Sequence, residues 1–146
     1  MRVNSAFRKK RRYHRAETVT PSPAEPVRVL LVDDQRLFVD AVGALLELDH
    51  RVEVVGVAQN ADEALALAAG TTVEVALVDL VLPGQDGGTL ARELQSVRPE
   101  VRIVLVSGRP EAELRAEAAE AGAAAYLRKG SLGGEIVDVI LEVAGA

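Results

Sequence analysis

Polar residues stand directly after apolar runs at several points in this chain, and their side chains could form one chemical site. Asp33 and Asp34 follow VRVLLV, and Asp79 follows VALV. Ser107 follows VRIVLV, and Lys129 stands just after a fifth short run. Strand packing needs none of these polar groups. Because the carboxyl ends of parallel strands share one edge of a sheet, we expect the five side chains to be neighbours.

Three carboxylates in one pocket repel one another, and their pKa values rise unless a cation neutralises them. A hard divalent ion is the natural partner, since Mg²⁺ prefers one or two carboxylates together with water and a phosphate oxygen. The chain has no cysteine, and its histidines, His14 and His50, do not follow any of these strands directly. A zinc site therefore lacks its usual ligands, and a magnesium site is indicated.

A carboxylate beside Mg²⁺ can accept a phosphoryl group, a reaction that needs positioning and charge neutralisation more than acid or base chemistry. Lys129 as a point cation and Ser107 as a hydroxyl donor could hold the transferred oxygens. Each residue alone has an ordinary structural explanation; Asp79, for example, precedes a Pro-Gly turn and could be only a turn former. Their joint occurrence at strand ends favours an aspartyl phosphate at Asp79.

The elements that must position these side chains alternate along the chain. Five apolar runs are typical of strands buried on both faces of a parallel sheet, and each is followed by a helical pattern. Crossover helices of this length imply right-handed βαβ connections and hence an α/β fold. The expected strands are 27–32, 52–58, 73–79, 101–106 and 124–127, each followed by a helix.

Several caps and turns are expected from local signals. Asn60 and Glu63 form a capping-box pattern, and Gly70 is expected in the C′ position of that helix. Gly84 is expected to take a positive φ in the turn after Asp79, and Ser131 is a candidate cap for the last helix. The helix over 36–49 is expected to face the core with Leu37, Ala41, Leu45 and Leu48.

Charge is divided unevenly along the 146 residues. Residues 1–26 carry a net charge of +5, which leaves −10 for the remainder, and this argues against nucleic acid or an anionic membrane as the target of the folded part. Residues 1–26 also lack apolar periodicity, so we expect a disordered basic extension before one domain over 27–146. No run is long enough to span a membrane and no secretory pattern is present, so a cytoplasmic protein is expected.

Together these motifs resemble a known family. The acidic pair after VRVLLV, the segment ALVDLVLPGQDGG, the strand IVLVSG and the segment AAAYLRKG look like the ordered motifs of two-component response-regulator receiver domains. The similarity covers about residues 27–145, and DDQRLF and KGSLGGEIVDVI are most similar to receivers of the NarL/FixJ type. The resemblance implies a CheY-like, flavodoxin-like (βα)5 fold, a doubly wound five-stranded parallel sheet of order 2-1-3-4-5.

The resemblance also implies roles at the acidic site. Asp79 would be the phosphoacceptor. Asp34 would ligate Mg²⁺ directly, Asp33 would do so through water, and the backbone carbonyl of Val81 would supply a further ligand. Lys129 would pair with the phosphoryl group.

A conformational switch is implied in the same way. Ser107 and Tyr126 would move when Asp79 is modified and would change the outer face of residues 111–143, where a partner would read the state. One feature departs from the family pattern, in which proline with a cis peptide commonly follows the lysine. This chain has Lys129-Gly130 instead, so the geometry of this loop is left open.

The expected function is that of a single-domain response regulator that receives its phosphoryl group from a sensor histidine kinase or a phosphotransfer protein. It would lose the group slowly without being a turnover enzyme, and a phosphorylation-dependent homodimer is a further expectation. Two alternatives stay open: a DNA-binding output that is missing or on another chain, and a basic tail that binds nucleic acid. An aspartyl-phosphate hydrolase would need an acid in place of Val81, and a flavin module would need a phosphate loop in place of the acidic pair.

Overall fold

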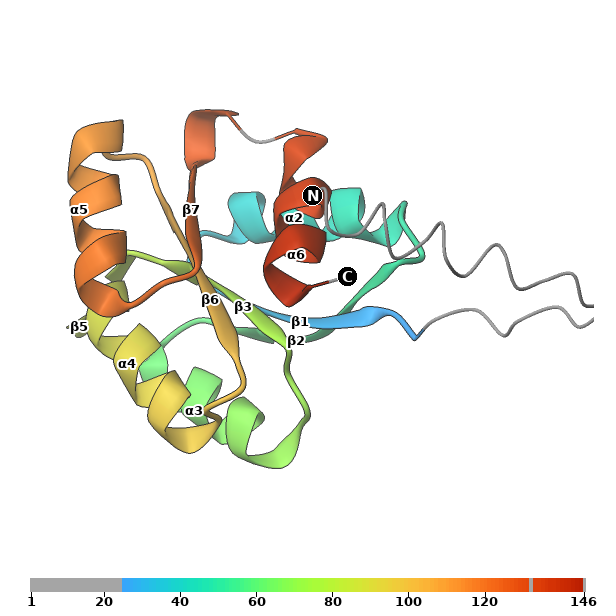
Figure 1. Ribbon diagram of the computed structural model, residues 1–146, viewed down its shortest axis with the longest axis horizontal. Helices are drawn as coiled ribbons and strands as arrows, with labels where there is room; N and C mark the ends of the chain where they lie inside the picture. The colour runs from blue at the N-terminus through green and yellow to red at the C-terminus, as the bar shows by residue number, and fades with distance from the viewer. Residues whose placement is uncertain (1–24, 132, 146) are drawn as a thin grey trace, which may run out of the picture.

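The computed structural model describes residues 25–131 and 133–145, so most of the expected basic extension lies outside the described residues. Five parallel strands form the central sheet (Figure 1), in the spatial order β2-β1-β3-β6-β7. In chain order this is 2-1-3-4-5, so the predicted topology is confirmed. The strands are β1 (Val27–Val32), β2 (Val52–Ala58), β3 (Val75–Asp79), β6 (Arg102–Ser107) and β7 (Ala125–Arg128).

Five helices cover the two faces of this sheet (Figure 1). Side chains of alternate residues along a strand point to opposite faces, which is why each strand contributes to two cores. In β1, for example, Val29 and Leu31 pack with α2 and α6, whereas Leu30 and Val32 pack with the other three helices. The helices are α2 (Arg36–Glu47), α3 (Ala61–Gly70), α4 (Gly87–Val97), α5 (Glu111–Ala121) and α6 (Glu135–Ala144).

A small hairpin follows β3 and was not expected from the sequence. Its strands, β4 (Val81–Leu82) and β5 (Gln85–Asp86), pair antiparallel. Gly84 has φ 79° in the connecting turn, a conformation that favours glycine, as predicted. The hairpin places Val81 two residues beyond Asp79 at the carboxyl edge of the sheet.

The core-facing side of α2 was predicted correctly only at Leu45, which is partly buried against the core, and wrongly at the other three positions. Leu37 and Leu48 are each 84% exposed, and Ala41 is exposed as well. The buried residues are instead Val42 and Leu46, one turn apart on the side that packs against the sheet. Apolar side chains lie on several sides of α2, so the spacing of apolar residues in the sequence did not identify which side is buried.

The C-terminus of α3 and the N-terminus of α6 differ from expectation. The N-terminus of α3 is capped as predicted, since Asn60 Oδ1 accepts a hydrogen bond from the Glu63 N–H at 2.9 Å. Its C-terminus lacks the predicted C′ glycine, because Gly70 is helical and the extended residue Thr71 ends the helix. The N-cap of α6 is Gly134 rather than Ser131.

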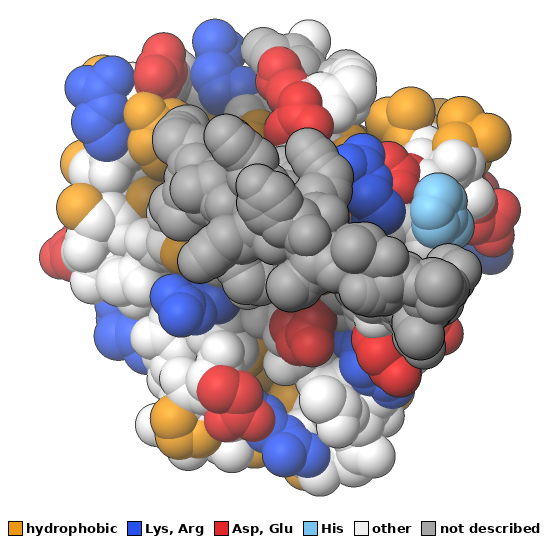
Figure 2. Space-filling view, turned by 45° about the vertical axis from the view of Figure 1, so that its right-hand side comes forward, with side chains coloured by type: hydrophobic (Ala, Val, Ile, Leu, Met, Phe, Trp, Pro, Cys, Tyr) orange, Lys and Arg blue, Asp and Glu red, His pale blue; other side chains and the backbone are white. Residues whose placement is uncertain are grey.

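The surface carries charges of both signs. On the coloured part of the face in Figure 2, acidic and basic side chains are interspersed, and the hydrophobic side chains form separate clusters among them. Within the described residues no helix has the length and hydropathy needed to cross a membrane.

Candidate functional site

Three acidic side chains meet at the carboxyl edge of the sheet. Asp33 and Asp34 follow β1 directly, and Asp79 is the last residue of the neighbouring strand β3. One oxygen from each carboxylate can be chosen so that all three lie within 4.8 Å of one another. Asp33 and Asp79 are buried, whereas Asp34 is exposed. The sequence prediction that these acids are neighbours agrees with this geometry.

Asp79 is the most constrained of the three. Its Oδ1 accepts a hydrogen bond from the Val81 N–H at 3.1 Å, and its Oδ2 accepts one from Lys129 Nζ at 3.2 Å. Burial raises the pKa of Asp79, and the nearby charge of Asp33 raises it further, while the Val81 N–H and Lys129 oppose the shift. Asp79 therefore sits where negative charge is costly unless cations are close.

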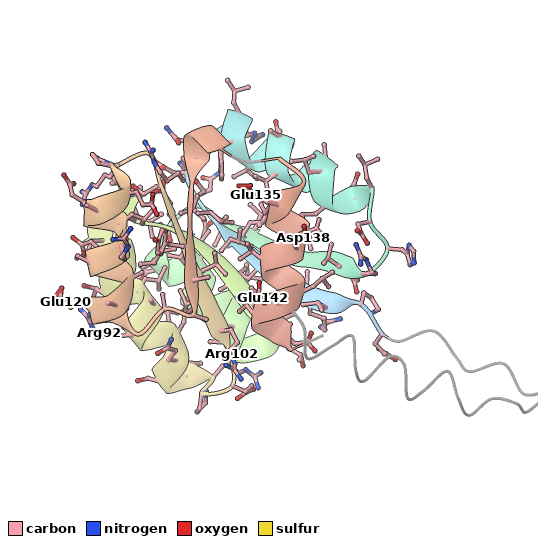
Figure 3. The ribbon with its side chains drawn as sticks, turned by 45° about the horizontal axis from the view of Figure 1, so that its top comes forward. Arg92, Arg102, Glu120, Glu135, Asp138 and Glu142 are labelled. Atoms are coloured by element: carbon pink, nitrogen blue, oxygen red, sulfur yellow. The ribbon has the colours of Figure 1, made fainter. Side chains whose placement is uncertain are left out.

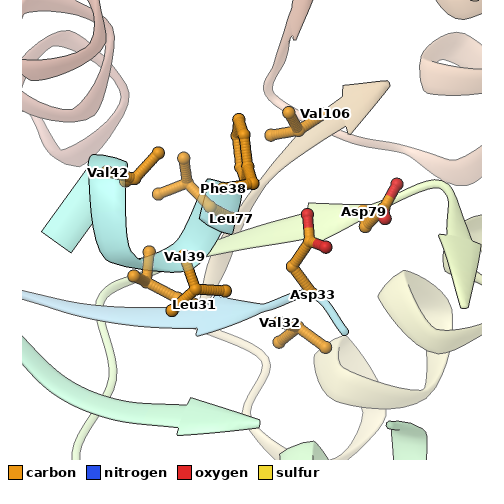
Figure 4. A pocket seen from close by; sticks show the side chains of 9 residues that line it. All are labelled: Leu31, Val32, Asp33, Phe38, Val39, Val42, Leu77, Asp79 and Val106. Atoms are coloured by element: carbon orange, nitrogen blue, oxygen red, sulfur yellow. The ribbon is translucent and has the colours of Figure 1, made fainter. Parts of the chain in front are cut away.

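A small, largely apolar cavity lies beside Asp33 and Asp79. Figure 4 shows these two side chains among the residues that line it, together with the ring of Phe38. The apolar side chains that line this cavity cannot solvate an ionised carboxylate. The charge on Asp79 must therefore be balanced by protein groups or by a cation. The cavity is lined by Leu31, Val32, Asp33, Phe38, Val39, Val42, Leu77, Asp79 and Val106.

Asp33 uses its two oxygens differently. Oδ1 accepts a hydrogen bond from the Gln35 N–H at 2.8 Å. Oδ2 lies 2.8 Å from Lys129 Nζ, but the angles fall outside hydrogen-bond geometry, so this buried oxygen accepts no hydrogen bond within the described residues. Asp33 Oδ2 therefore interacts with Lys129 as an ion pair and not as a hydrogen-bond acceptor.

Lys129 places a positive charge beside the acids. Besides Asp33 and Asp79, its ammonium contacts the side-chain oxygen of Gln35 and lies 4.5 Å from the centroid of the Phe38 ring. Its side chain is only 17% exposed, which is low for a lysine. The backbone from Lys129 to Ser131 forms one 3₁₀ turn, and no peptide bond in the described segments is cis.

Ser107 ends β6 beside Asp79. It is buried, and its Oγ accepts a hydrogen bond from the Arg109 N–H at 3.0 Å. Together with Gly108 and Arg109 it forms one wall of an open crevice over Asp79. The structure therefore brings Ser107 to the acidic site, as expected. The other residues of this crevice are Asp34, Gln35, Val81 and Lys129.

Tyr126 does not line this crevice. Its hydroxyl donates a hydrogen bond to Glu111 Oε2 at 3.0 Å and accepts one from Arg115 Nε at 3.2 Å. Both partners belong to α5, so the phenol is attached to the outer helix. The tyrosine lies two positions before Arg128, the β7 residue that pairs with Ser107, which places it next to the site but outside it.

The donor set at the acidic edge fits a hard divalent cation. Three carboxylates converge from two strands, and the buried Asp33 Oδ2 accepts no hydrogen bond in the described part of the chain, although the Lys129 ammonium lies 2.8 Å from it. Oxygen donors of this kind suit Mg²⁺ or Ca²⁺, whereas zinc sites use nitrogen and sulfur ligands more often. The residues present can therefore hold such an ion.

Several residues that touch the site or its tyrosine were not identified from the sequence, among them Arg109, whose N–H donates to Ser107 Oγ. Gln35 and Phe38 contact Lys129, and Glu111 and Arg115 contact Tyr126. Gln35 could have been noticed, because it follows the acidic pair directly. The pairing of α5 with Tyr126 depends on how the helix rotates against the sheet, and no local motif indicates it.

Comparisons with known proteins agree on one family. A family model for the response regulator receiver domain matches residues 29–141 of this chain. The match begins within β1, includes Asp33, Asp34 and Asp79, and ends within α6.

Curated relatives are longer than this chain. "Probable transcriptional regulatory protein NarL" of Mycobacterium tuberculosis is 38% identical over 124 residues, which are 85% of this chain and 57% of that protein. Response regulator UvrY of Escherichia coli is 33% identical over 117 residues, 80% of this chain and 54% of that protein. The chain thus spans little more than half the length of these relatives.

Solved structures share the fold. The signal receiver domain of NarL from Mycobacterium tuberculosis superposes with a TM-score of 0.78 at 36% identity, covering 84% of this chain and 99% of that one. A response regulator from Burkholderia pseudomallei, solved with a phosphorylated aspartic acid, a calcium ion and citrate, gives 0.68 at 30% identity and covers 79% of this chain and 66% of that one.

Proposed function

This chain belongs to the response regulator receiver domain family, and we propose that it accepts a phosphoryl group on Asp79. The observation that carries the proposal is the position of this carboxylate. Asp79 is buried at the end of β3, within hydrogen-bond reach of Lys129 and beside two further acids. An acid held in this way is poised as an acceptor. The related structure from Burkholderia pseudomallei contains a phosphorylated aspartic acid, which supports the same reading.

Asp33, Asp34 and Asp79 would hold the divalent cation, which we propose is Mg²⁺. Val81 lines the same crevice, and we propose that its backbone carbonyl supplies a further ligand. When bound, the ion would supply positive charge against the carboxylates and the incoming phosphoryl oxygens. The family relative that contains a calcium ion supports a cation of this hard, oxygen-binding class.

In the proposed reaction a carboxylate oxygen of Asp79 forms a bond to phosphorus while the bond from phosphorus to the donor breaks. With acetyl phosphate the leaving group is acetate. With the phosphohistidine of a sensor kinase or phosphotransfer protein it is imidazole, which leaves as the neutral ring after taking up one proton. The ammonium of Lys129, already 3.2 Å from Asp79 Oδ2, would pair with the new phosphoryl oxygens.

The new group adds a charge of about −1.5 to −2 at the crevice and fresh acceptor oxygens. Ser107 forms the crevice wall, so its hydroxyl would turn toward those oxygens. Movement of Ser107 and Tyr126 would then alter the face made by α5, β7 and α6, which corresponds to residues 111–143. Along α6 this face is acidic, with Glu135, Asp138 and Glu142 exposed (Figure 3). We propose that the protein or domain that reads the phosphorylated state binds there.

Intact-mass measurement after incubation with Mg²⁺ and acetyl phosphate tests the proposal. Wild-type protein should gain one phosphoryl group, and Asp79→Asn should gain none. Asp86→Asn is the matched control, because Asp86 caps α4 outside the crevice and its loss should leave the adduct intact. A wild type that stays unmodified with Mg²⁺ present, or an adduct that persists in Asp79→Asn, would contradict the assignment.

A further inference from the structure

Helix α2 begins at a residue whose side chain does not cap it. The N-cap is Gln35, and its side chain accepts no hydrogen bond from the first turn of the helix. Ser, Thr, Asp and Asn are the residues that stabilise this position through their side chains, and glutamine is not among them. By contrast, Asn60 caps α3 and Asp86 caps α4 in the ordinary way. The glutamine at the start of α2 is therefore not explained by helix stability.

The Gln35 side chain instead reaches a residue 94 positions away. Its Oε1 accepts a hydrogen bond from Lys129 Nζ, while its backbone N–H donates to Asp33 Oδ1 at 2.8 Å. One residue thus contacts the lysine with its side chain and an acid of the proposed cation site with its main chain.

Phe38, one turn further along α2, contributes a second neutral acceptor. Its ring centroid lies 4.5 Å from Lys129 Nζ, within the range of a cation–π contact. The first turn of α2 therefore offers the ammonium two uncharged contacts, in addition to the two carboxylates of Asp33 and Asp79.

A divalent cation would affect the charged contacts of Lys129 differently from its uncharged contacts with Gln35 and Phe38. A cation between the acids competes with the ammonium for carboxylate oxygens, because both are positive and both need the same lone pairs. The amide oxygen of Gln35 is uncharged and therefore a weaker competitor for the ion than a carboxylate, and the ring of Phe38 offers no oxygen at all. Gln35 and Phe38 can therefore keep Lys129 at the crevice when the carboxylates coordinate a divalent cation.

Resting on the proposed function, we infer that Gln35 is a positioning residue that restrains Lys129 beside Asp79 for phosphoryl transfer. A lysine side chain has many rotamers, and ordering it at the moment of reaction costs free energy. Restraining it beforehand removes part of that cost, which is the usual benefit of preorganisation.

Two variants separate this role from a structural one. Gln35→Met keeps the length of the side chain but removes the acceptor. Gln35→Asn is one methylene shorter and introduces a favoured N-cap residue, so it should keep or raise the thermal midpoint of unfolding while it loses contact with Lys129. Gln95→Met on α4 is the control for the same chemical change away from the crevice.

The first readout is the rate of phosphorylation by acetyl phosphate with saturating Mg²⁺, followed by intact mass. Losing one hydrogen bond to a charged group should slow both Gln35 variants about three- to tenfold, and Gln95→Met should match wild type. A purely structural role predicts the opposite order, with Gln35→Asn as fast as wild type or faster.

The second readout does not depend on the reaction. The chain has three lysines, Lys9, Lys10 and Lys129, so ¹³Cε lysine labelling gives a simple spectrum in which Lys129→Arg identifies the signal of interest. Relaxation of this signal should show a more mobile side chain in both Gln35 variants than in wild type.

The outcomes are distinguishable. If wild type forms no adduct, the proposed function fails, and the reactive role of Gln35 fails with it. If wild type is phosphorylated normally but both Gln35 variants react at its rate, or Lys129 is equally rigid in all three proteins, the inference about Gln35 alone is overturned.

Discussion

The hydroxyl of Tyr126 on β7 donates a hydrogen bond to the carboxylate of Glu111, in the first turn of α5, at 3.0 Å. Arg115 completes the group, since its guanidinium contacts both the phenol oxygen and Glu111. The tyrosine that we propose as a switch is thus attached to α5 by two of its charged side chains.

Glu111→Gln should loosen this attachment. A phenol hydrogen-bonded to a carboxylate fluoresces weakly, because the excited phenol can transfer its proton, so emission from Tyr126 should rise in the variant. The chain has no tryptophan and one other tyrosine, Tyr13, so the measurement is made in a Tyr13→Phe background. Glu113→Gln removes the same charge from the same helical turn and should leave emission unchanged. Equal emission from both variants would argue against the attachment.

Gly87→Ala should damage the backbone behind Asp79. A Cβ at this position would lie 2.2 Å from the carbonyl oxygen of Asp79 and 2.8 Å from Leu80 Cα, and both neighbours are main-chain atoms that cannot swing aside. We expect a loss of roughly 1–3 kcal/mol in the free energy of unfolding, measured by urea denaturation. In the adjacent Gly88→Ala the new Cβ would lie 3.2 Å from Asp86 Oδ1 and 3.8 Å from Ala121 Cβ, both side-chain atoms, so this change should cost much less. Similar losses in the two variants would show that the close approach is unimportant.

Arg98→Met should destabilise α3 although Arg98 belongs to the end of α4. Its guanidinium donates to the carbonyls of Ala68 at 2.7 Å and Ala69 at 3.3 Å, which are otherwise free acceptors at the end of α3. Loss of these bonds should lower the free energy of unfolding by about 1 kcal/mol. Arg92→Met makes the same substitution at an exposed position of α4 and should have little effect on the free energy of unfolding. Hydrogen exchange should rise locally at the end of α3 in Arg98→Met, and exchange that matches wild type there would contradict this role.

Asp79→Asn should be more stable than wild type at neutral pH without divalent ions. Burial raises the pKa of Asp79 in the folded protein above its unfolded value, so ionisation disfavours the folded state. Proton linkage gives the direction of the pH dependence. The contribution of Asp79 to the free energy of unfolding of wild type is highest below the pKa of the unfolded state and declines as pH rises through the pKa of the folded state. The stability gap between variant and wild type should therefore be small in acid and grow toward neutral pH. Urea denaturation in the presence of a chelator at several pH values measures it, and a gap that shrinks with rising pH would refute the argument.

The sheet order and the meeting of the acids could be predicted because both depend on short local signals. Apolar runs that end in a polar residue determine where each strand stops, and parallel pairing then places Asp33 and Asp79 at one edge. No long-range information is needed for that step.

Details that depend on packing between elements could not be predicted in the same way. Leu37 and Leu48 are exposed because α2 presents another stripe of its apolar surface, Val42 and Leu46, to the sheet. The end of α3 needed no C′ glycine, since Arg98 from a later helix supplies donors to its carbonyls. Both outcomes are decided by partners that lie far away in the sequence.

The scarcity of lysine gives Lys129 a practical use. From residue 27 onward it is the sole lysine in the chain, and its ammonium lies 3.2 Å from Asp79 Oδ2. An amine-reactive cross-linker can therefore attach to this part of the chain at one side chain only, next to the carboxylate where a phosphoryl donor must dock. A protein captured through Lys129 would therefore have been caught at the crevice itself.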